Sequence, residues 1–159
     1  MKFVADGMLG KLTRWLRMLG YDVIYFNQSE DSELIAMAKK ENRILLTRDL
    51  ELYKRASANG VNTLYVEGTT EAEKLSVLAK HLAFSLTINL KHSRCPKCNA
   101  KIRLTSKEKL AGKVDKNTFI HYKEFWECSR CGNVYWQGSH WKGIYATLKE
   151  AKKIKRSQA

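Results

Sequence analysis

The sequence predicts an α/β protein, with a parallel sheet covered by helices on both faces and a small β-rich module after it. Two observations indicate the sheet: short apolar runs alternate with helical periodicity over residues 1–90, and no proline interrupts them, since the single proline is Pro96. A third observation indicates the module, because all four cysteines follow residue 90. We therefore expect two domains, residues 1–90 and 91–159, with a boundary at Asn89–Arg94.

Strand-like and helix-like segments take turns in the first domain. The leucines at positions 9, 12, 16 and 19 share one face of the first helix, and Gly20 is its expected C-terminal cap. Ser29 is the expected N-cap of the second helix, which has acids in its first turn and lysines in its last. Helical connections of this length imply right-handed crossovers between parallel strands. In order, we expect strand 2–6, helix 9–19, strand 21–26, helix 30–40, strand 43–47, helix 50–58, strand 61–66 and helix 70–84.

The second domain shows a different pattern. It contains short β-like pieces, many lysines and a basic segment at the end that we expect to be helical. The β-like pieces are residues 101–104, 118–122, 124–127 and 133–136, and the basic segment is 147–157.

The positive charge of the chain is concentrated in the second domain. Residues 1–90 contain 12 Lys and Arg against 11 Asp and Glu, a net charge of +1, whereas residues 91–159 contain 17 against 5, a net charge of +12. Such an asymmetry favours nucleic acid or another anionic surface as a partner. A merely soluble, lysine-rich surface is the alternative. No apolar run is long enough to span a bilayer and no signal-peptide pattern opens the chain, so we expect a cytoplasmic protein.

The cysteines form two Cys-x2-Cys knuckles, Cys95 with Cys98 and Cys128 with Cys131. Two such pairs supply the four thiolates of a closed tetrahedral zinc site, which leaves no position for water and is therefore structural. Disulfides, redox chemistry of the thioredoxin kind and an iron ion in a rubredoxin-like site are the alternatives. A module with so little apolar sequence is expected to need its metal to fold.

Carboxylates follow the predicted strands. Asp6 ends the first strand, Asp49 follows the third, and Asp31 lies at the start of the second helix. In a parallel sheet these positions share one edge, where clustered carboxylates can bind Mg2+ or Mn2+. The same residues are also ordinary helix N-caps, and spacing alone does not separate the two readings.

Several segments resemble the Mut-seven C-terminal RNase family, in which a PIN-like nuclease domain precedes a zinc ribbon. The segments are FVADGMLGKLTRWLRMLGYDV, DSELIAMAKKENRILLTRDLEL, CPKCN, CSRCG and VYWQGSHW. The resemblance implies a PIN-like fold, a metal-dependent (endo)ribonuclease, and metal-binding catalytic roles for Asp6, Asp31 and Asp49. PIN domains usually supply a fourth acid, for which Glu51 and Glu67 are the candidates here. By analogy with those domains a homodimer is also an expectation.

Basic and aromatic residues are the candidates for RNA binding. Lysine and arginine beside the acids would hold phosphates, and aromatics amid lysines are typical of proteins that stack single-stranded RNA. Solvated helix faces, a small ribbon's own core and a disordered tail are the alternatives. The candidates are Lys11, Arg14, Arg48, His140, Trp141, Lys152 and Lys153. The alternative to a nuclease is a non-catalytic RNA- or ribosome-binding protein with too few acids for turnover. A phosphatase that uses Asp6 is a third and less well supported hypothesis.

Overall fold

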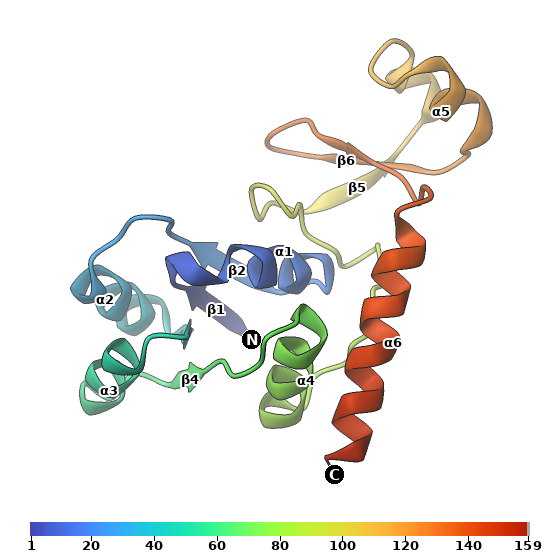
Figure 1. Ribbon diagram of the computed structural model, residues 1–159. Helices are drawn as coiled ribbons and strands as arrows, with labels where there is room; N and C mark the ends of the chain where they lie inside the picture. The colour runs from blue at the N-terminus through green and yellow to red at the C-terminus, as the bar shows by residue number, and fades with distance from the viewer. Residues whose placement is uncertain (159) are drawn as a thin grey trace.

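The computed structural model describes residues 1–158 and contains two sheets. The first has four parallel strands in the order β2-β1-β3-β4, with a helix after each strand (Figure 1). The predicted α/β class with a parallel sheet is therefore confirmed. Its elements are β1 (Lys2–Ala5), the 3-10 turn η1 (Gly7–Leu9), α1 (Gly10–Met18), β2 (Asp22–Tyr25), α2 (Asp31–Glu41), β3 (Ile44–Thr47), α3 (Leu50–Ala58), β4 (Thr63–Tyr65) and α4 (Glu71–Leu82).

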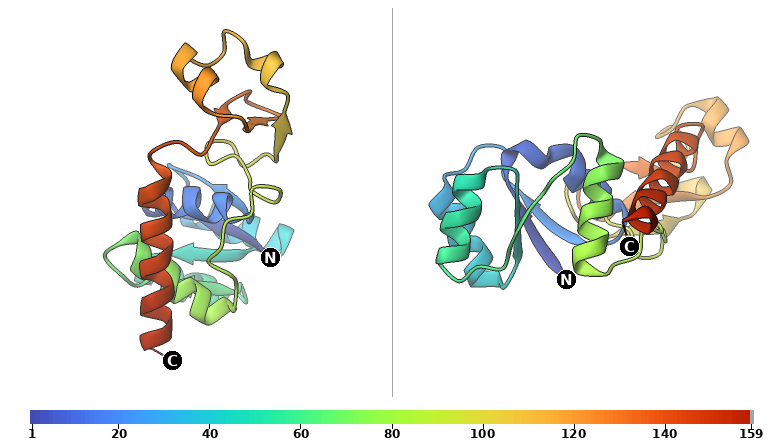
Figure 2. Two further views of the ribbon diagram at one scale, coloured as in Figure 1. Left: turned by 90° about the vertical axis from the view of Figure 1, so that its right-hand side faces the viewer. Right: turned by 60° about the horizontal axis from the view of Figure 1, so that its bottom comes forward.

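Successive side chains of each strand point to opposite faces of the sheet, and each face packs into its own apolar core. In β1, Phe3 and Ala5 join the core with α1 and α4, whereas Val4 joins the core with α2 and α3. β3 divides in the same way, with Leu46 in the first core and Leu45 in the second. Helices therefore cover both faces of the sheet, and the loops that follow the strands lie at one edge (Figure 2).

Two helices of this unit begin with capping boxes. Thr70 caps α4 with Glu73, and Glu30 caps α2 with Glu33. The prediction that Ser29 caps the second helix is therefore wrong. A glutamate at the N-cap can accept the same amide hydrogen bond as a serine, and the Glu33 carboxylate accepts one from the Glu30 backbone amide at 3.3 Å.

The second sheet is antiparallel and belongs to the cysteine-bearing ribbon, with strands in the order β5-β6-β7. One predicted strand is wrong, because residues 118–122 lie mostly in a helix. Asp115 caps that helix by accepting a hydrogen bond from the Thr118 amide at 3.0 Å, which outweighs the β-branched and aromatic composition of the segment. The elements are β5 (Ile102–Thr105), the 3-10 turn η2 (Lys107–Leu110), α5 (Lys116–His121), β6 (Phe125–Cys128) and β7 (Val134–Tyr135).

The basic C-terminal segment is a long helix, α6 (Trp141–Ser157), which returns to the first sheet and packs along α4 (Figures 1 and 2). Leu148 and Ala151 are buried in the same core as Phe3 and Leu78. The apolar face of α6 thus completes the first unit, while its lysines lie on the outside. The domain boundary at residue 90 stays a prediction. α6 follows that boundary in the sequence but packs against the unit that precedes it.

The first cysteine knuckle is fastened to the α/β unit by buried polar contacts. Arg17 of α1 donates to the Val23 carbonyl at 2.8 Å and to the Pro96 carbonyl at 2.9 Å. From the ribbon side, Asn99 donates to the Asp22 carboxylate at 2.8 Å and accepts from the Val23 amide at 3.0 Å. Arg17 and Val23 are buried and the contacts to Pro96 and Asn99 are partly buried, so this junction holds the knuckle beside α1.

None of the helices in the part of the chain that the structure describes combines the length and the apolar character required to cross a membrane.

The packing of α6 predicts a large effect of Leu148→Ala. Leu148 is 3% exposed in the main core, so removal of its side chain leaves a cavity beneath α6. We expect the free energy of unfolding to fall by about 2–4 kcal/mol in urea denaturation. Lys149→Ala changes the neighbouring exposed position and is expected to leave stability within about 0.5 kcal/mol of the parent. Equal stability of the two variants would contradict this packing.

Candidate functional site

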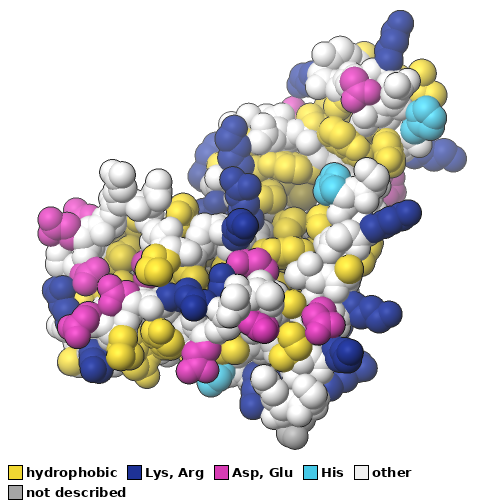
Figure 3. Space-filling model, viewed as in Figure 1, with side chains coloured by type: hydrophobic (Ala, Val, Ile, Leu, Met, Phe, Trp, Pro, Cys, Tyr) yellow, Lys and Arg dark blue, Asp and Glu magenta, His cyan; other side chains and the backbone are white. Residues whose placement is uncertain are grey.

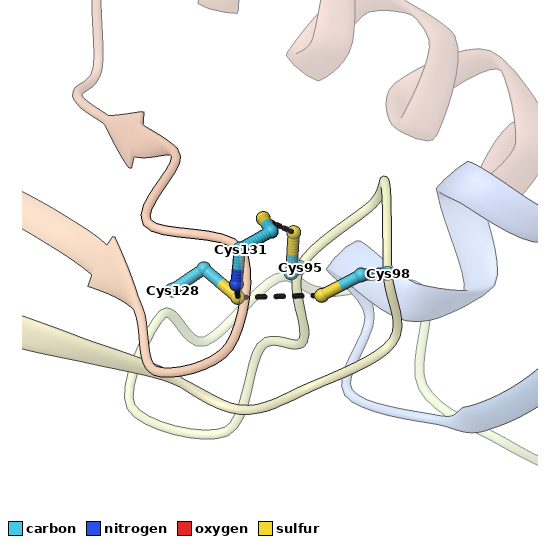
Figure 4. Close-up of side chains that lie close together, drawn as sticks. All are labelled: Cys95, Cys98, Cys128 and Cys131. Atoms are coloured by element: carbon cyan, nitrogen blue, oxygen red, sulfur yellow. Dashed lines mark hydrogen bonds between the residues drawn. The ribbon is translucent and has the colours of Figure 1, made fainter.

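The four cysteine sulfurs form one cluster between the two knuckles (Figure 4). All four sulfur atoms lie within 4.8 Å of one another, with 3.7 Å between Cys95 and Cys131 and 3.3 Å between Cys98 and Cys128. A tetrahedral zinc ion with Zn–S bonds of about 2.3 Å places its sulfurs about 3.8 Å apart, whereas a disulfide requires about 2.05 Å. The donor chemistry and the spacing therefore fit zinc, and none of the four cysteines is in a disulfide.

The surroundings of the cluster alter the acidity of its thiols. Burial acts to raise the pKa of Cys128, but hydrogen bonds from the amides of Cys131 and Arg130 outweigh it and lower the pKa to about 6. Burial raises the pKa of Cys98 to about 11. Tyr135 lies with its hydroxyl 3.0 Å from the Cys95 sulfur, and burial together with this contact raises the pKa of the tyrosine. Cys128 therefore gives up its proton more readily than Cys98, and a thiol must lose its proton to bind a metal.

At the carboxyl edge of the parallel sheet, Thr47 links Asp6 to Asp49. Its hydroxyl donates to the Asp6 carboxylate and accepts from the Asp49 amide at 2.9 Å. Asp6 is 6% exposed, and its second oxygen accepts from the Met8 amide at 3.0 Å. Thr47 reaches the Asp6 carboxylate because β1 and β3 are neighbours in the sheet. The Thr47 hydroxyl therefore orients the Asp6 carboxylate.

The turn after Asp6 requires a glycine. A Cβ atom at Gly7 would lie 2.7 Å from the Asn27 carbonyl oxygen, well inside van der Waals contact. The Tyr25 hydroxyl donates to the Gly7 carbonyl at 2.9 Å and so fastens the same turn to the end of β2. The Asp6–Gly7 pair is therefore held from two sides, by β3 and by β2.

Asp31 and Asp49 each have a structural partner. Asp31 accepts from Arg55 of α3 at 3.3 Å, and one Asp49 oxygen caps α3 by accepting from the amides of Glu51 and Leu52 at 2.9 and 3.3 Å. Within residues 1–158, the cysteine quartet is the only group of three or more potential metal ligands that lie together. The structure thus brings Asp6 and Asp49 to one threonine but does not gather all three predicted aspartates around one point.

The predicted RNA-binding residues of the α/β unit lie near this edge in two environments. Lys11 and Arg14 are exposed on α1, directly after the Asp6 turn. Arg48 donates to the Gly68 carbonyl, so its guanidinium holds the loop before α4. Arg17 follows Lys11 and Arg14 on α1 but is only 8% exposed. Its guanidinium donates to the Pro96 carbonyl of the ribbon.

The predicted RNA-binding residues of the ribbon and α6 are more scattered. His140 is exposed at the start of α6, whereas Trp141 is 9% exposed and donates its indole N–H to the Trp136 carbonyl at 3.0 Å. Trp141 is therefore part of the packing and offers no open stacking face here. Lys152 donates to Thr87 at 3.2 Å, and Lys153 is exposed. Both lysines lie near the far end of α4, where Lys80 contacts Gln158, and not beside Asp6.

Acidic and basic side chains occupy different parts of the surface. Figure 3 shows Asp and Glu side chains gathered over α2 and α3, and Lys and Arg side chains along α6 and in a column where the ribbon meets α1. Tyr25 and Lys97, which lie together with α1 residues in one groove, are not among the predicted site residues. The position of Tyr25 at the end of a strand was the signal that could have found it. Lys97 could be placed only once the knuckle was known to lie beside α1.

Comparison with known proteins confirms the family resemblance. The model of the Mut7-C RNase domain family matches residues 1–148, so the chain belongs to this family of RNase domains. A human protein named "Exonuclease mut-7 homolog" is 34% identical over 101 residues, which are 62% of this chain and 12% of that protein. The chain thus spans a small part of the length of this relative. No solved structure matches the chain.

Proposed function

We propose that this chain is a metal-dependent ribonuclease that hydrolyses RNA phosphodiester bonds at the carboxyl edge of its parallel sheet. The observation that carries the proposal is the pair of aspartates, Asp6 and Asp49, joined through Thr47 in a member of an RNase domain family. Membership in that family supports a nuclease. RNA as the substrate, metal dependence and the acidic site are our inference.

The aspartate pair fits Mg2+ or Mn2+ by its donor chemistry. Magnesium in proteins is usually bound by one or two carboxylates, with waters and substrate phosphate oxygens as its other ligands. Asp6 and Asp49 are hard oxygen donors, and one Asp49 oxygen is free of the cap hydrogen bonds. When bound, such an ion would lower the pKa of water and neutralise charge on the phosphate. Asp31 has one oxygen engaged by Arg55 and does not lie in one group with Asp6 and Asp49 within residues 1–158.

The other residues of the edge would position the carboxylates and the substrate. Thr47 holds the Asp6 carboxylate and the start of α3 in a fixed relation, which limits reorganisation during the reaction. Lys11 and Arg14 follow Asp6 on α1 and would hold RNA phosphates as point charge and fork, respectively. The zinc ion would be held by Cys95, Cys98, Cys128 and Cys131, where it stabilises the ribbon and takes no part in hydrolysis.

The ion requirement and the choice of nucleic acid test the proposal together. Purified protein is incubated with a labelled single-stranded RNA and with DNA of the same sequence, in Mg2+, in Mn2+ or with EDTA. We expect cleavage of the RNA in either cation and none with EDTA, and re-addition of Mg2+ should restore it. Cleavage at full rate in EDTA would exclude the proposed chemistry, and equal cleavage of DNA would exclude RNA specificity.

The separate position of Asp31, which within residues 1–158 belongs to no group of three metal ligands, favours a second function, an RNA-binding protein without turnover. Only two of the predicted aspartates then remain for a metal, fewer than the acidic set that the family resemblance implies. Tight binding of RNA with no cleavage in Mg2+ or Mn2+ would support this second function over the first.

The role of Thr47 predicts that Thr47→Val slows cleavage about 10- to 100-fold with little change in KM, because a disordered Asp6 affects the reaction more than binding. The free energy of unfolding should fall by about 1–3 kcal/mol, since two hydrogen bonds are lost and the Asp49 amide is left without its partner. Thr47→Ser keeps the hydroxyl and should restore most of the rate. A rate that is low in both variants would argue against a role for the hydroxyl.

A further inference from the structure

A groove of about 400 Å³ lies between α1 and the first cysteine knuckle. Lys11, Thr13 and Arg14 line one wall, Tyr25 closes the end towards β2, and Lys97 comes from the knuckle. The groove therefore needs both the α/β unit and the ribbon. In Figure 3 the column of Lys and Arg side chains marks the place where these two parts meet.

The cations of the groove have no acidic partners. Lys11, Arg14 and Lys97 are all exposed, and within residues 1–158 none of them forms an ion pair with a carboxylate. By contrast, Lys74, Lys113, Arg43 and Arg55 each pair with an acid. Uncompensated positive charge from two structural units in one groove favours an anionic occupant.

A buried hydroxyl in the groove wall also has no partner. Thr13 is 1% exposed, and its Oγ1 atom makes no hydrogen bond in the structure. Most buried hydroxyls are hydrogen-bonded, so an unpaired one needs an explanation. Because Thr13 lines the groove, a ligand bound there would be within reach as a partner for this hydroxyl.

Tyr25 connects the groove with the Asp6 turn. Tyr25, which closes the groove, donates to the Gly7 carbonyl, and the next amide, that of Met8, donates to Asp6. On the other side, Arg17 fixes the carbonyls of Pro96 and Lys97 at 2.9 and 3.3 Å, which holds the knuckle in place. The groove and the turn that follows Asp6 are therefore both contacted by the same tyrosine.

We propose that this groove binds a backbone phosphate of the RNA strand, one that neighbours the phosphate at Asp6 and Asp49. Lys11 and Lys97 supply charge from opposite walls, Arg14 supplies a planar fork of donors, and Thr13 supplies its free hydroxyl. This inference rests on the proposed function for its substrate. It adds that the ribbon contributes a direct phosphate contact through Lys97.

Binding without cleavage separates the two proposals. The affinity for a fluorescein-labelled single-stranded RNA is measured by anisotropy at several salt concentrations, with no divalent cation added, for Arg14→Gln, Lys97→Gln and the control Lys54→Gln on α3. We expect each groove variant to bind about 3- to 30-fold more weakly, and the slope of log affinity against log salt to fall by about 0.7 for each lost phosphate contact. Lys54→Gln should match the parent protein.

Thr13→Val separates a ligand contact from a structural role. Because Oγ1 has no protein partner, its replacement by a methyl group should leave the melting temperature equal or higher, while RNA affinity falls several-fold. Zinc content is measured for Lys97→Gln to confirm an intact knuckle. Weakened RNA binding in a protein that never cleaves would retain the groove and reject the nuclease. Unchanged affinity and salt slope in Arg14→Gln and Lys97→Gln would overturn the groove, whatever the cleavage activity.

Discussion

Asp6→Asn is expected to reduce RNA cleavage by at least about 100-fold, the size of effect seen when a group that acts on the transition state is removed. The substitution keeps the shape of the side chain and an oxygen for the Met8 amide, but it removes the negative charge that a cation would need. The rate of cleavage of a labelled RNA in Mg2+ measures the effect. The melting temperature should change only slightly, which shows that the loss is chemical.

Asp115→Asn is the matched control for this result. Asp115 lies in the ribbon as the N-cap of α5, and asparagine is an equally good N-cap, so neither stability nor cleavage should change. Cleavage by Asp6→Asn at the rate of the control would remove Asp6 from the reaction. Helix N-capping would then be enough to explain the acids at the carboxyl edge.

Cys95→Ser is expected to release the zinc and unfold the ribbon. Cys95 is fully buried, its sulfur lies within the four-thiol cluster, and it contacts Tyr135 of β7. Structural zinc sites of this kind contribute about 10–16 kcal/mol of binding free energy in zinc-finger peptides at pH 7, so loss of one ligand removes much of what holds a small ribbon together. Metal analysis measures the zinc, and NMR measures the dispersion of the ribbon amides.

The α/β unit should remain folded in this variant, because its two cores contain no ribbon strand residue. Ser129→Ala, within the second knuckle, keeps all four thiols and is expected to retain a full equivalent of zinc. A Cys95→Ser protein with normal zinc content and unchanged ribbon signals would show that the cluster does not bind the metal through four sulfurs.

The parallel sheet was predictable because its signals are local. Residues 3–5 and 44–47 are short apolar runs, and the leucines of α1 repeat at helical spacing. The packing of α6 was not predictable in the same way. The apolar face around Leu148 indicates that this helix packs against another element but does not identify it. The partner, α4, lies more than sixty residues earlier in the chain. The composition of residues 118–122 favours a strand, but the N-cap at Asp115 stabilises a helix there.

The candidate site was predictable in its residue types but not in its grouping. Thr47 reaches the Asp6 carboxylate because β1 and β3 are adjacent, and strand order depends on tertiary packing. The partner of Asp31, Arg55, comes from α3 and has no sequence signal that links it to the start of α2. Similarly, Arg17 follows Lys11 and Arg14 in one basic stripe, yet contacts with the Val23 and Pro96 carbonyls place it in the interior.

The most direct test of a two-aspartate site is the cleavage rate of Asp6→Asn/Asp49→Asn beside the two single variants. Residues that act as a unit show strongly non-additive effects. If Asp6 and Asp49 serve one site, each single variant should lose at least about 100-fold, and the double variant should be no slower than the slower single one. Single variants that retain the parent rate, or a double variant that loses the product of two separate effects, would contradict the account.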